Sequence, residues 1–337
     1  MLAVQSAAII ATLIAITSVD STEVKQQTLG VSSNLRTTTV LRNLESSDSS
    51  CECKLAPRPC VFFHGIGNKN EMAELQDIPK NTSGRMGNMN AHAPCCSTVK
   101  YAVLNTVDYG WTDDTLQQKF CDHALSMSDS SDVIAHSIRD TVVVTHSMGG
   151  LVMAGAVATG KCRFDVSSAW VSISAPMMGS MAADYIEDFC NDEIDDIKTE
   201  LFDLLGYCPV PVARKSITYQ NEKHSSPELN AAYTAAQKAY GANVYASMCS
   251  NYYDGVVSQY QVQSVIAGKI IPHKSRKNDG LVEFQSCAAG LSESLFGDSY
   301  EYRFYAPRLN HADTAFLTHD GLFKDSQKPF KWFECLF

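Results

Sequence analysis

The sequence TVVVTHSMGG, at residues 141–150, is followed by the helix-forming run LVMAGAVA, at residues 151–158. The β-branched residues at its start favour a strand, and the run after Gly150 favours a helix. Ser147 lies between them, flanked by the small residues that a tight strand-to-helix turn requires. In such a turn the first N–H groups of the helix face the serine side chain. The stretch therefore predicts a nucleophile elbow with Ser147 as the nucleophile.

Apolar runs alternate with helical patterns elsewhere in the chain. Strands are predicted at residues 59–63, 99–107, 141–145, 169–174 and 300–305, with a helix at 148–158. Strands that alternate with helices indicate βα units and a parallel sheet. With 337 residues, 45% of them hydrophobic, the chain can bury one large core. We therefore predict an α/β fold in which helices flank a mostly parallel sheet.

Composition divides the chain into further regions. Residues 1–20 are interpreted as a signal peptide, because 7–16 form an apolar run that is too short to span a bilayer. Residues 21–50, rich in Ser and Thr, are interpreted as a flexible leader. The folded domain is expected over 51–337, with a cap or insertion at 181–250. Its stretch 185–205 has apolar residues at helical spacings, which suits either a lid over a cleft or an ordinary helix on the core.

The twelve cysteines are even in number and all follow residue 50. Together with the signal peptide they indicate a secreted protein with several disulfides, whose pairing the sequence leaves open. Their spacing is not that of a zinc knuckle. The net charge of −10 argues against a nucleic-acid partner, because binding phosphates needs a basic face. We expect a monomer.

A serine hydroxyl becomes a good nucleophile only beside a base that an acid orients. Asp279 is the preferred acid, in an Asp-Gly turn before an apolar run, and Asp254 is the alternative. Only His311 and His319 follow Asp279, as the chain order serine, acid, base requires. His311 is preferred, because it follows the last predicted strand. Together with Ser147 these residues predict acyl-transfer chemistry on an ester, thioester or amide.

A second backbone donor is predicted upstream of the elbow. The segment HGIG, at residues 64–67, follows the first predicted strand. Its glycines allow the backbone to approach a substrate closely. The N–H of Ile66 is therefore expected to form an oxyanion hole with the N–H of Met148.

These segments together resemble the α/β-hydrolase lipases and esterases. The motifs are HGIG at 64–67, THSMGG at 145–150, NDGLV at 278–282 and NHAD at 310–313, and the last two are especially similar to bacterial triacylglycerol lipases. The resemblance implies an α/β-hydrolase fold. It also implies roles for five residues, namely Ser147 as nucleophile, Asp279 as acid, His311 as base, and Ile66 and Met148 as oxyanion donors.

Near these motifs, one residue departs from the pattern of the family and another matches a position that binds metal in the lipases. Thr145 stands where the family usually has Gly or Ala, and a β-branched residue is expected to crowd the elbow. The lipases also bind a structural calcium, partly through an acid at the position of Asp313. One carboxylate does not make a calcium site, so we assign no metal and no cofactor.

The resemblance implies a secreted serine acyl hydrolase, a lipase or carboxylesterase that acts through an acyl-enzyme on lipid or small ester substrates. Peripheral contact with lipid interfaces is part of this expectation. The early HGIG segment also resembles that of palmitoyl-protein thioesterases, so such a thioesterase is one alternative. A hydrolase-like binding protein without turnover is the other.

Overall fold

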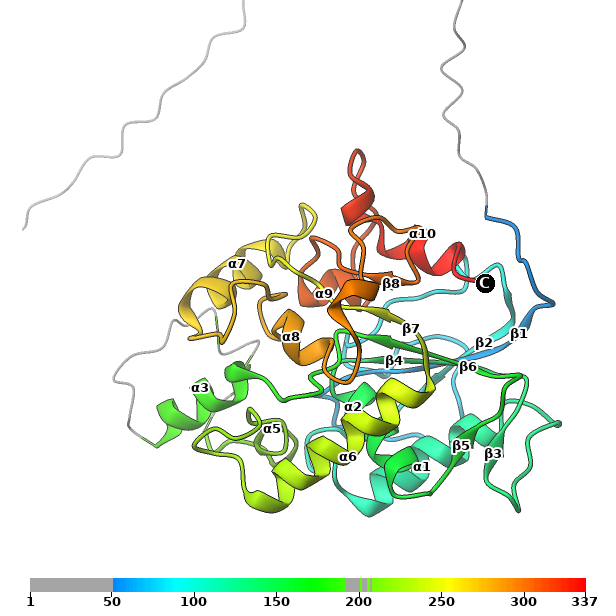
Figure 1. Ribbon diagram of the computed structural model, residues 1–337, viewed down its shortest axis with the longest axis horizontal. Coiled ribbons are helices and arrows are strands. Elements are labelled where there is room, and N and C mark those ends of the chain that lie inside the picture. The colour runs from blue at the N-terminus through cyan, green and yellow to red at the C-terminus, as the bar shows by residue number, and fades with distance from the viewer. Residues whose placement is uncertain (1–50, 192–200, 202–204, 207) are drawn as a thin grey trace, which may run out of the picture. The chain divides into compact units, whose positions relative to one another are not determined.

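The computed structural model describes residues 51–191, 201, 205, 206 and 208–337 (Figure 1). The predicted signal peptide and leader, and most of the stretch 192–205, lie outside the described residues. Among the residues that are described, no helix has the length and apolar character needed to cross a membrane.

Six parallel strands form the main sheet, in the order β2-β1-β4-β6-β7-β8. Their bounds are β1 Arg58–Phe63, β2 Cys96–Ala102, β4 Val142–His146, β6 Ala169–Ile173, β7 Val244–Met248 and β8 Phe304–Tyr305. A separate parallel pair consists of β3 Ser137–Ile138 and β5 Arg163–Phe164. The prediction of a mostly parallel sheet is confirmed.

Helices lie on both sides of this sheet (Figure 1). In chain order they are α1 Asp114–Leu125, α2 Met148–Ala158, α3 Met181–Cys190, α5 Val212–Lys215, α6 Pro227–Asn243, α7 Gln261–Ile270, α8 Phe284–Cys287, α9 His311–Thr314 and α10 Pro329–Glu334. Two short 3-10 helices are η1 Glu293–Leu295 and η2 Asp325–Gln327. The bounds of α2 are those predicted from the sequence.

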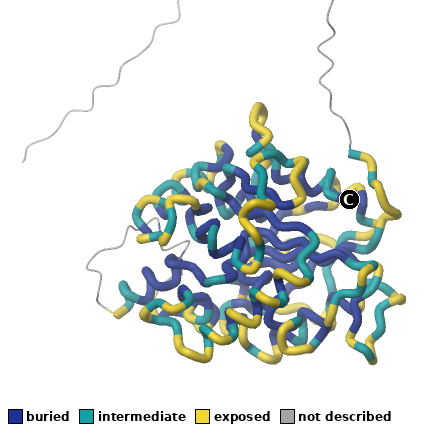
Figure 2. Tube along the Cα trace, in the orientation of Figure 1, coloured by how far each residue is buried: buried dark blue, intermediate teal, exposed yellow. Residues whose placement is uncertain are grey.

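Alternate side chains of each strand enter two different cores. Phe63 and Val143 face a core shared with α1, α2 and α6. Phe62 and Val144 face the opposite core, which Trp332 of α10 helps to fill. Buried residues accordingly run along the strands (Figure 2). Because both faces are covered, β4 is apolar along most of its length, which is typical of a parallel strand.

The predicted insertion at 181–250 is wrong in its C-terminal part. β7 lies between β6 and β8 in the main sheet, and α6 packs against α2. Residues 227–248 are therefore a helix–strand unit of the central fold. Upstream of them, α3 contributes Ile186 to a small separate core that also contains Ala267 of α7.

All twelve cysteines are paired, as the even count led us to expect. The disulfides are Cys51–Cys335, Cys53–Cys95, Cys60–Cys96, Cys121–Cys162, Cys190–Cys208 and Cys249–Cys287. The first joins the start of the described chain to the segment after α10, across 284 residues of sequence.

Replacing Cys249 and Cys287 together by alanine is expected to lower the free energy of unfolding by about 2–4 kcal/mol. Their disulfide links residues separated by 38 positions, and its loss increases the entropy of the unfolded chain. The matched control is the double alanine variant of Cys121 and Cys162, separated by 41 positions, which should lose a similar amount. Urea unfolding followed by tryptophan fluorescence measures both, and unchanged stability in both variants would contradict the expectation.

Candidate active site

The strand order places two chain segments at one edge of the sheet. From β1 the chain moves outward to β2, and it then returns past β1 to β4. In parallel sheets, ligands bind beyond the carboxyl ends of the strands at such a reversal. β1 ends at Phe63, directly before the HGIG segment, and β4 ends at His146, directly before Ser147. The sequence therefore brings the glycine loop and the serine together.

The backbone at Ser147 forms a sharp turn. Its φ of 55° and ψ of −132° lie outside the conformations that residues with a side chain normally adopt, and α2 begins at the next residue. A Cβ atom on Gly65 would lie 2.6 Å from the Cβ of Ser147, and one on Gly149 would lie 2.7 Å from the backbone oxygen of His64. Glycine is therefore required at both positions, because the glycine loop and the elbow touch.

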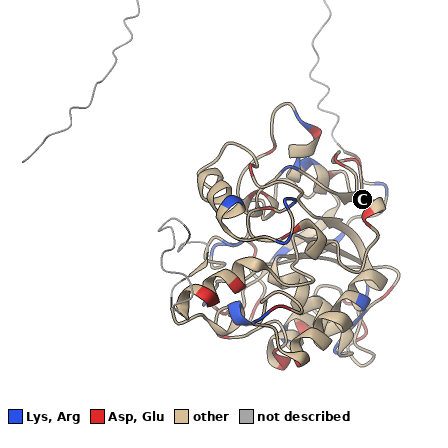
Figure 3. Ribbon diagram, turned by 60° about the vertical axis from the view of Figure 1, so that its left-hand side comes forward, with Lys and Arg blue, Asp and Glu red and all other residues tan. Residues whose placement is uncertain are grey.

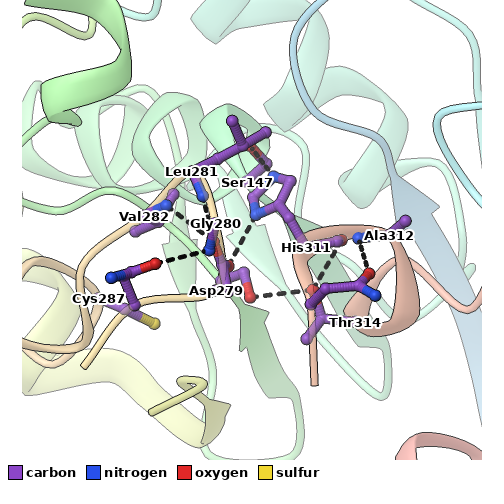
Figure 4. A network of polar contacts seen from close by, with 12 residues as sticks. Ser147, Asp279, Gly280, Leu281, Val282, Cys287, His311, Ala312 and Thr314 are labelled. Atoms are coloured by element: carbon purple, nitrogen blue, oxygen red, sulfur yellow. Dashed lines mark hydrogen bonds and ion pairs between the residues drawn. The ribbon is translucent and has the colours of Figure 1, made fainter. Parts of the chain in front are cut away.

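Ser147, His311 and Asp279 form a continuous hydrogen-bonded line (Figure 4). Ser147 Oγ lies 3.0 Å from His311 Nε2, and His311 Nδ1 lies 2.8 Å from Asp279 Oδ2. Asp279 Oδ1 accepts hydrogen bonds from the N–H groups of Leu281 and Val282, at 2.9 and 2.7 Å. Both carboxylate oxygens are thus occupied, and the carboxylate is fixed toward the imidazole.

The environment of Asp279 favours its charged form. The residue is 1% exposed, and burial by itself opposes ionisation. The neighbouring His311 and the two backbone donors outweigh burial, so the pKa of Asp279 is lowered from its ordinary value. A carboxylate at this position holds the proton on Nδ1 of His311. Nε2 is then left to accept a hydrogen bond from the Ser147 hydroxyl.

The two alternative residues lie elsewhere. Asp254 forms an ion pair with Arg308, at 2.9 Å. His319 is exposed, and its Nδ1 lies 3.0 Å from the backbone oxygen of Asp320. The structure therefore brings together the preferred acid and base, and neither alternative.

The carboxylate of Asp313, the position that the resemblance relates to a calcium ligand, lies among hydrogen-bond donors of the protein. It accepts hydrogen bonds from the N–H groups of Asn310 and Val256, each at 3.0 Å, and from the Thr318 hydroxyl at 2.8 Å. No group of three or more His, Cys, Asp or Glu side chains that could hold a metal occurs in the part of the chain that the structure describes. Asp313 instead completes the capping box that begins α9, directly after Asn310.

Next to Ser147 lies a cavity of about 390 Å³. It is lined in part by the apolar side chains of Ile66, Ile217, Leu281 and Leu317. Within the described chain, neither the N–H of Ile66 nor that of Met148 donates a hydrogen bond to another backbone group. The two predicted oxyanion donors therefore remain available beside the serine.

His64 supports the glycine loop, a role that sequence reasoning missed. Its Nε2 accepts a hydrogen bond from the Leu104 N–H at 3.2 Å, so Nδ1 carries the proton and donates to the Gly65 oxygen at 2.8 Å. The Thr106 hydroxyl donates to the same oxygen at 2.9 Å. Burial lowers the pKa of His64 to about 4, and the ring is therefore neutral at pH 7. These hydrogen bonds therefore hold the residues before Ile66 to the segment that follows β2.

Thr145, the β-branched residue expected to crowd the elbow, lies within β4. Its side chain is fully buried, and its hydroxyl accepts a hydrogen bond from the Trp170 indole N–H at 2.9 Å. The hydroxyl therefore meets a polar partner on β6, and the turn at Ser147 keeps its form.

Three further residues at the cavity could not be recognised as site residues from the sequence. His146 is buried, and its ring centre lies 4.6 Å from that of His311. Burial first, and the nearby His311 second, hold the pKa of His146 well below its ordinary value. Arg85 and Arg214 also line the cavity. Both lie in irregular or short segments, where no periodic pattern indicates which way a side chain points.

No family model matches the chain, and no curated protein does. Solved structures similar to it include the mature form of lipase BlEst2 from Bacillus licheniformis, with 15% identity and a TM-score of 0.47 over 76% of this chain and 86% of that one. The Staphylococcus hyicus lipase has 14% identity and a TM-score of 0.38, over 83% and 95% of the two chains. Lipase 1 from Pelosinus fermentans has 14% identity and a TM-score of 0.41, over 83% and 97%.

The fold is that of the α/β-hydrolases. Three features define this fold: a mostly parallel sheet, a strand–turn–helix at Ser147, and the chain order serine, acid, histidine.

Replacing His64 by glutamine is expected to flatten the dependence of stability on pH. The folded pKa is about 4 and the unfolded pKa about 6.5, so between these values the unfolded chain binds a proton that the folded chain does not. The stability of the natural protein should therefore fall with falling pH, by about 1.4 kcal/mol per unit from this group. Urea unfolding at pH 7, 6 and 5 measures the slope, and equal slopes for His64→Gln and the natural chain would contradict the assignment.

Proposed function

We propose that the protein is a serine hydrolase that cleaves carboxylic esters through an acyl-enzyme. One observation carries this proposal, namely the hydrogen-bonded line from Asp279 through His311 to Ser147, which ends beside a cavity. The arrangement supplies a nucleophile, a base within reach of it, and an acid that orients the base.

In the first step Ser147 Oγ attacks the ester carbonyl carbon and gives its proton to His311 Nε2. Asp279 stabilises the imidazolium that forms. His311 then returns the proton to the leaving alcohol, and the acyl group remains on Ser147. A water molecule then attacks the acyl carbon and gives a proton to the same Nε2, and His311 passes this proton to Ser147 Oγ as the acid leaves.

The N–H groups of Ile66 and Met148 stabilise the negative charge on the carbonyl oxygen during both attacks. Each such donor typically contributes about 3–4 kcal/mol of transition-state stabilisation. The hydrogen bonds of His64 and Thr106 to Gly65 fix the loop before Ile66, so this donor is in place before the substrate arrives.

The cavity supports an ester with a short or medium acyl chain, because its volume and partly apolar lining suit a small molecule. We also propose that the protein acts outside the cell. Six disulfides form readily in an oxidising compartment, and the predicted signal peptide would direct the chain there.

Ser147→Ala and His311→Ala are each expected to lower kcat for p-nitrophenyl butyrate by at least about 10³-fold, because each removes one partner of the proton transfer. The matched control is His319→Ala, which removes an exposed imidazole outside the site and should leave kcat unchanged. Circular dichroism and thermal unfolding establish that each variant folds.

The proposal fails if folded Ser147→Ala hydrolyses the ester at the rate of the natural protein. Loss of activity in His319→Ala, with activity kept in His311→Ala, would show that the base is assigned to the wrong histidine.

A further inference from the structure

The cavity beside Ser147 contains positive charge that ester hydrolysis alone does not require. Its lining includes Arg85 and Arg214, and among the described lining residues there is no Asp or Glu. The chain as a whole has a net charge of −10, and both signs of charge occur throughout the described chain (Figure 3). The cavity is thus lined by two arginines in a chain whose net charge is negative.

The Arg85 guanidinium lies against the glycine loop. A Cβ atom on Gly67, whose φ is 99°, would lie 2.9 Å from Arg85 Nη2 and 3.0 Å from Arg85 Nε. Gly67 follows Ile66, the proposed oxyanion donor. The guanidinium thus sits one residue from the place where the ester carbonyl would bind, and the glycine makes room for it.

The Nε atom of Arg85 is a buried hydrogen-bond donor, and it has no acceptor within the described chain. Burial lowers the pKa of Arg85, and the nearby Tyr260 opposes this to a lesser extent. A buried donor without an acceptor is costly, and its presence at a cavity calls for a ligand that supplies one.

Arg214 adds a second charge to the same cavity. It is 9% exposed, and burial first, with the charge of Arg85 second, lowers its pKa to about 10. The two arginines therefore influence each other's charge, and Arg85, with its buried Nε, is the one that we assign to a ligand.

We propose that the cavity takes esters that carry an anionic oxygen group, a phosphate or a carboxylate, close to the bond that is cleaved, and that Arg85 binds this group. The proposal rests on the function proposed above and names its substrate class. A guanidinium matches both groups, because its planar fork donates two parallel hydrogen bonds to two of their oxygens. Arg85 acts as a specificity residue, whereas Ser147, His311 and Asp279 carry the reaction.

The test compares two matched pairs of soluble substrates. In the phosphate pair, 1-butyryl-glycerol 3-phosphate is compared with 1-monobutyrin, which lacks only the phosphate. In the carboxylate pair, monoethyl succinate is compared with diethyl succinate. For each pair the ratio of kcat/KM, anionic over neutral, is measured for the natural protein, Arg85→Met, Arg85→Lys and the control Arg139→Met. Arg139 pairs with Asp132 and Asp165, so this control changes the net charge equally without touching the cavity.

We expect the natural protein to favour the anionic member of at least one pair, and that pair identifies the group. Arg85→Met should lower this ratio by about 10- to 100-fold, Arg85→Lys should lower it less, and Arg139→Met should leave it in place. Inorganic phosphate should also inhibit butyrate ester hydrolysis competitively in the natural protein, and more weakly in Arg85→Met. A purely structural role of Arg85 would lower kcat/KM for both members equally and leave the ratio unmoved.

The inference is overturned if the neutral member is preferred in both pairs, or if Arg85→Met keeps the ratio of the natural protein. Either result leaves the proposed ester hydrolysis standing, as long as the neutral esters are cleaved. If no ester is cleaved, the proposed function fails. Calorimetric titration of the natural protein with inorganic phosphate then shows whether the cavity binds an anion. Binding that Arg85→Met weakens supports the site, and absence of binding overturns it.

Discussion

The backbone at Ser147 is held in a conformation that costs about 1–3 kcal/mol for a residue with a side chain, and the rest of the site is built around it. Close contacts enforce the conformation. A Cβ atom on Gly150 would lie 2.4 Å from the Cβ of Ala175, and Gly65 meets the serine from the opposite loop. The N–H of Ser147 also donates to the oxygen of Ile173 at the end of β6. The sheet and its neighbouring loops therefore hold the serine at the cavity, beyond the carboxyl end of β4.

The residues that form hydrogen bonds around Ser147 come from distant parts of the chain. Ser147 and His311 are separated by 164 residues, and they meet because β4 and β8 are parallel and end at the same edge of the sheet. Two features fix the partners in place. The backbone N–H of His311 donates to the backbone oxygen of Asp279, and Cys287, at the end of α8, is joined to Cys249, directly after β7. Acid and base are therefore held to each other as well as to the sheet.

The sequence predicted those features that local chemistry requires. The elbow at Ser147, the helix over 148–158 and the Asp-Gly turn at 279 each need particular residues at neighbouring positions, and the structure has them there. What depends on distant contacts could not be predicted. β7 is a five-residue strand whose place is set by pairing with β6 and β8, so its segment was assigned to an insertion. Arg85 lines the cavity from a segment without regular secondary structure, and the pairing of twelve cysteines is a property of the folded chain.

The central claim is that the folded chain activates the hydroxyl of Ser147. The most direct measurement is reaction of the folded protein with a fluorophosphonate, followed by digestion and mass spectrometry of the labelled peptide. The account predicts one adduct per chain, on Ser147, and no adduct after the protein is reduced and unfolded, because activation depends on His311 and Asp279. Labelling at a different serine, or a folded protein that takes no label, would contradict it.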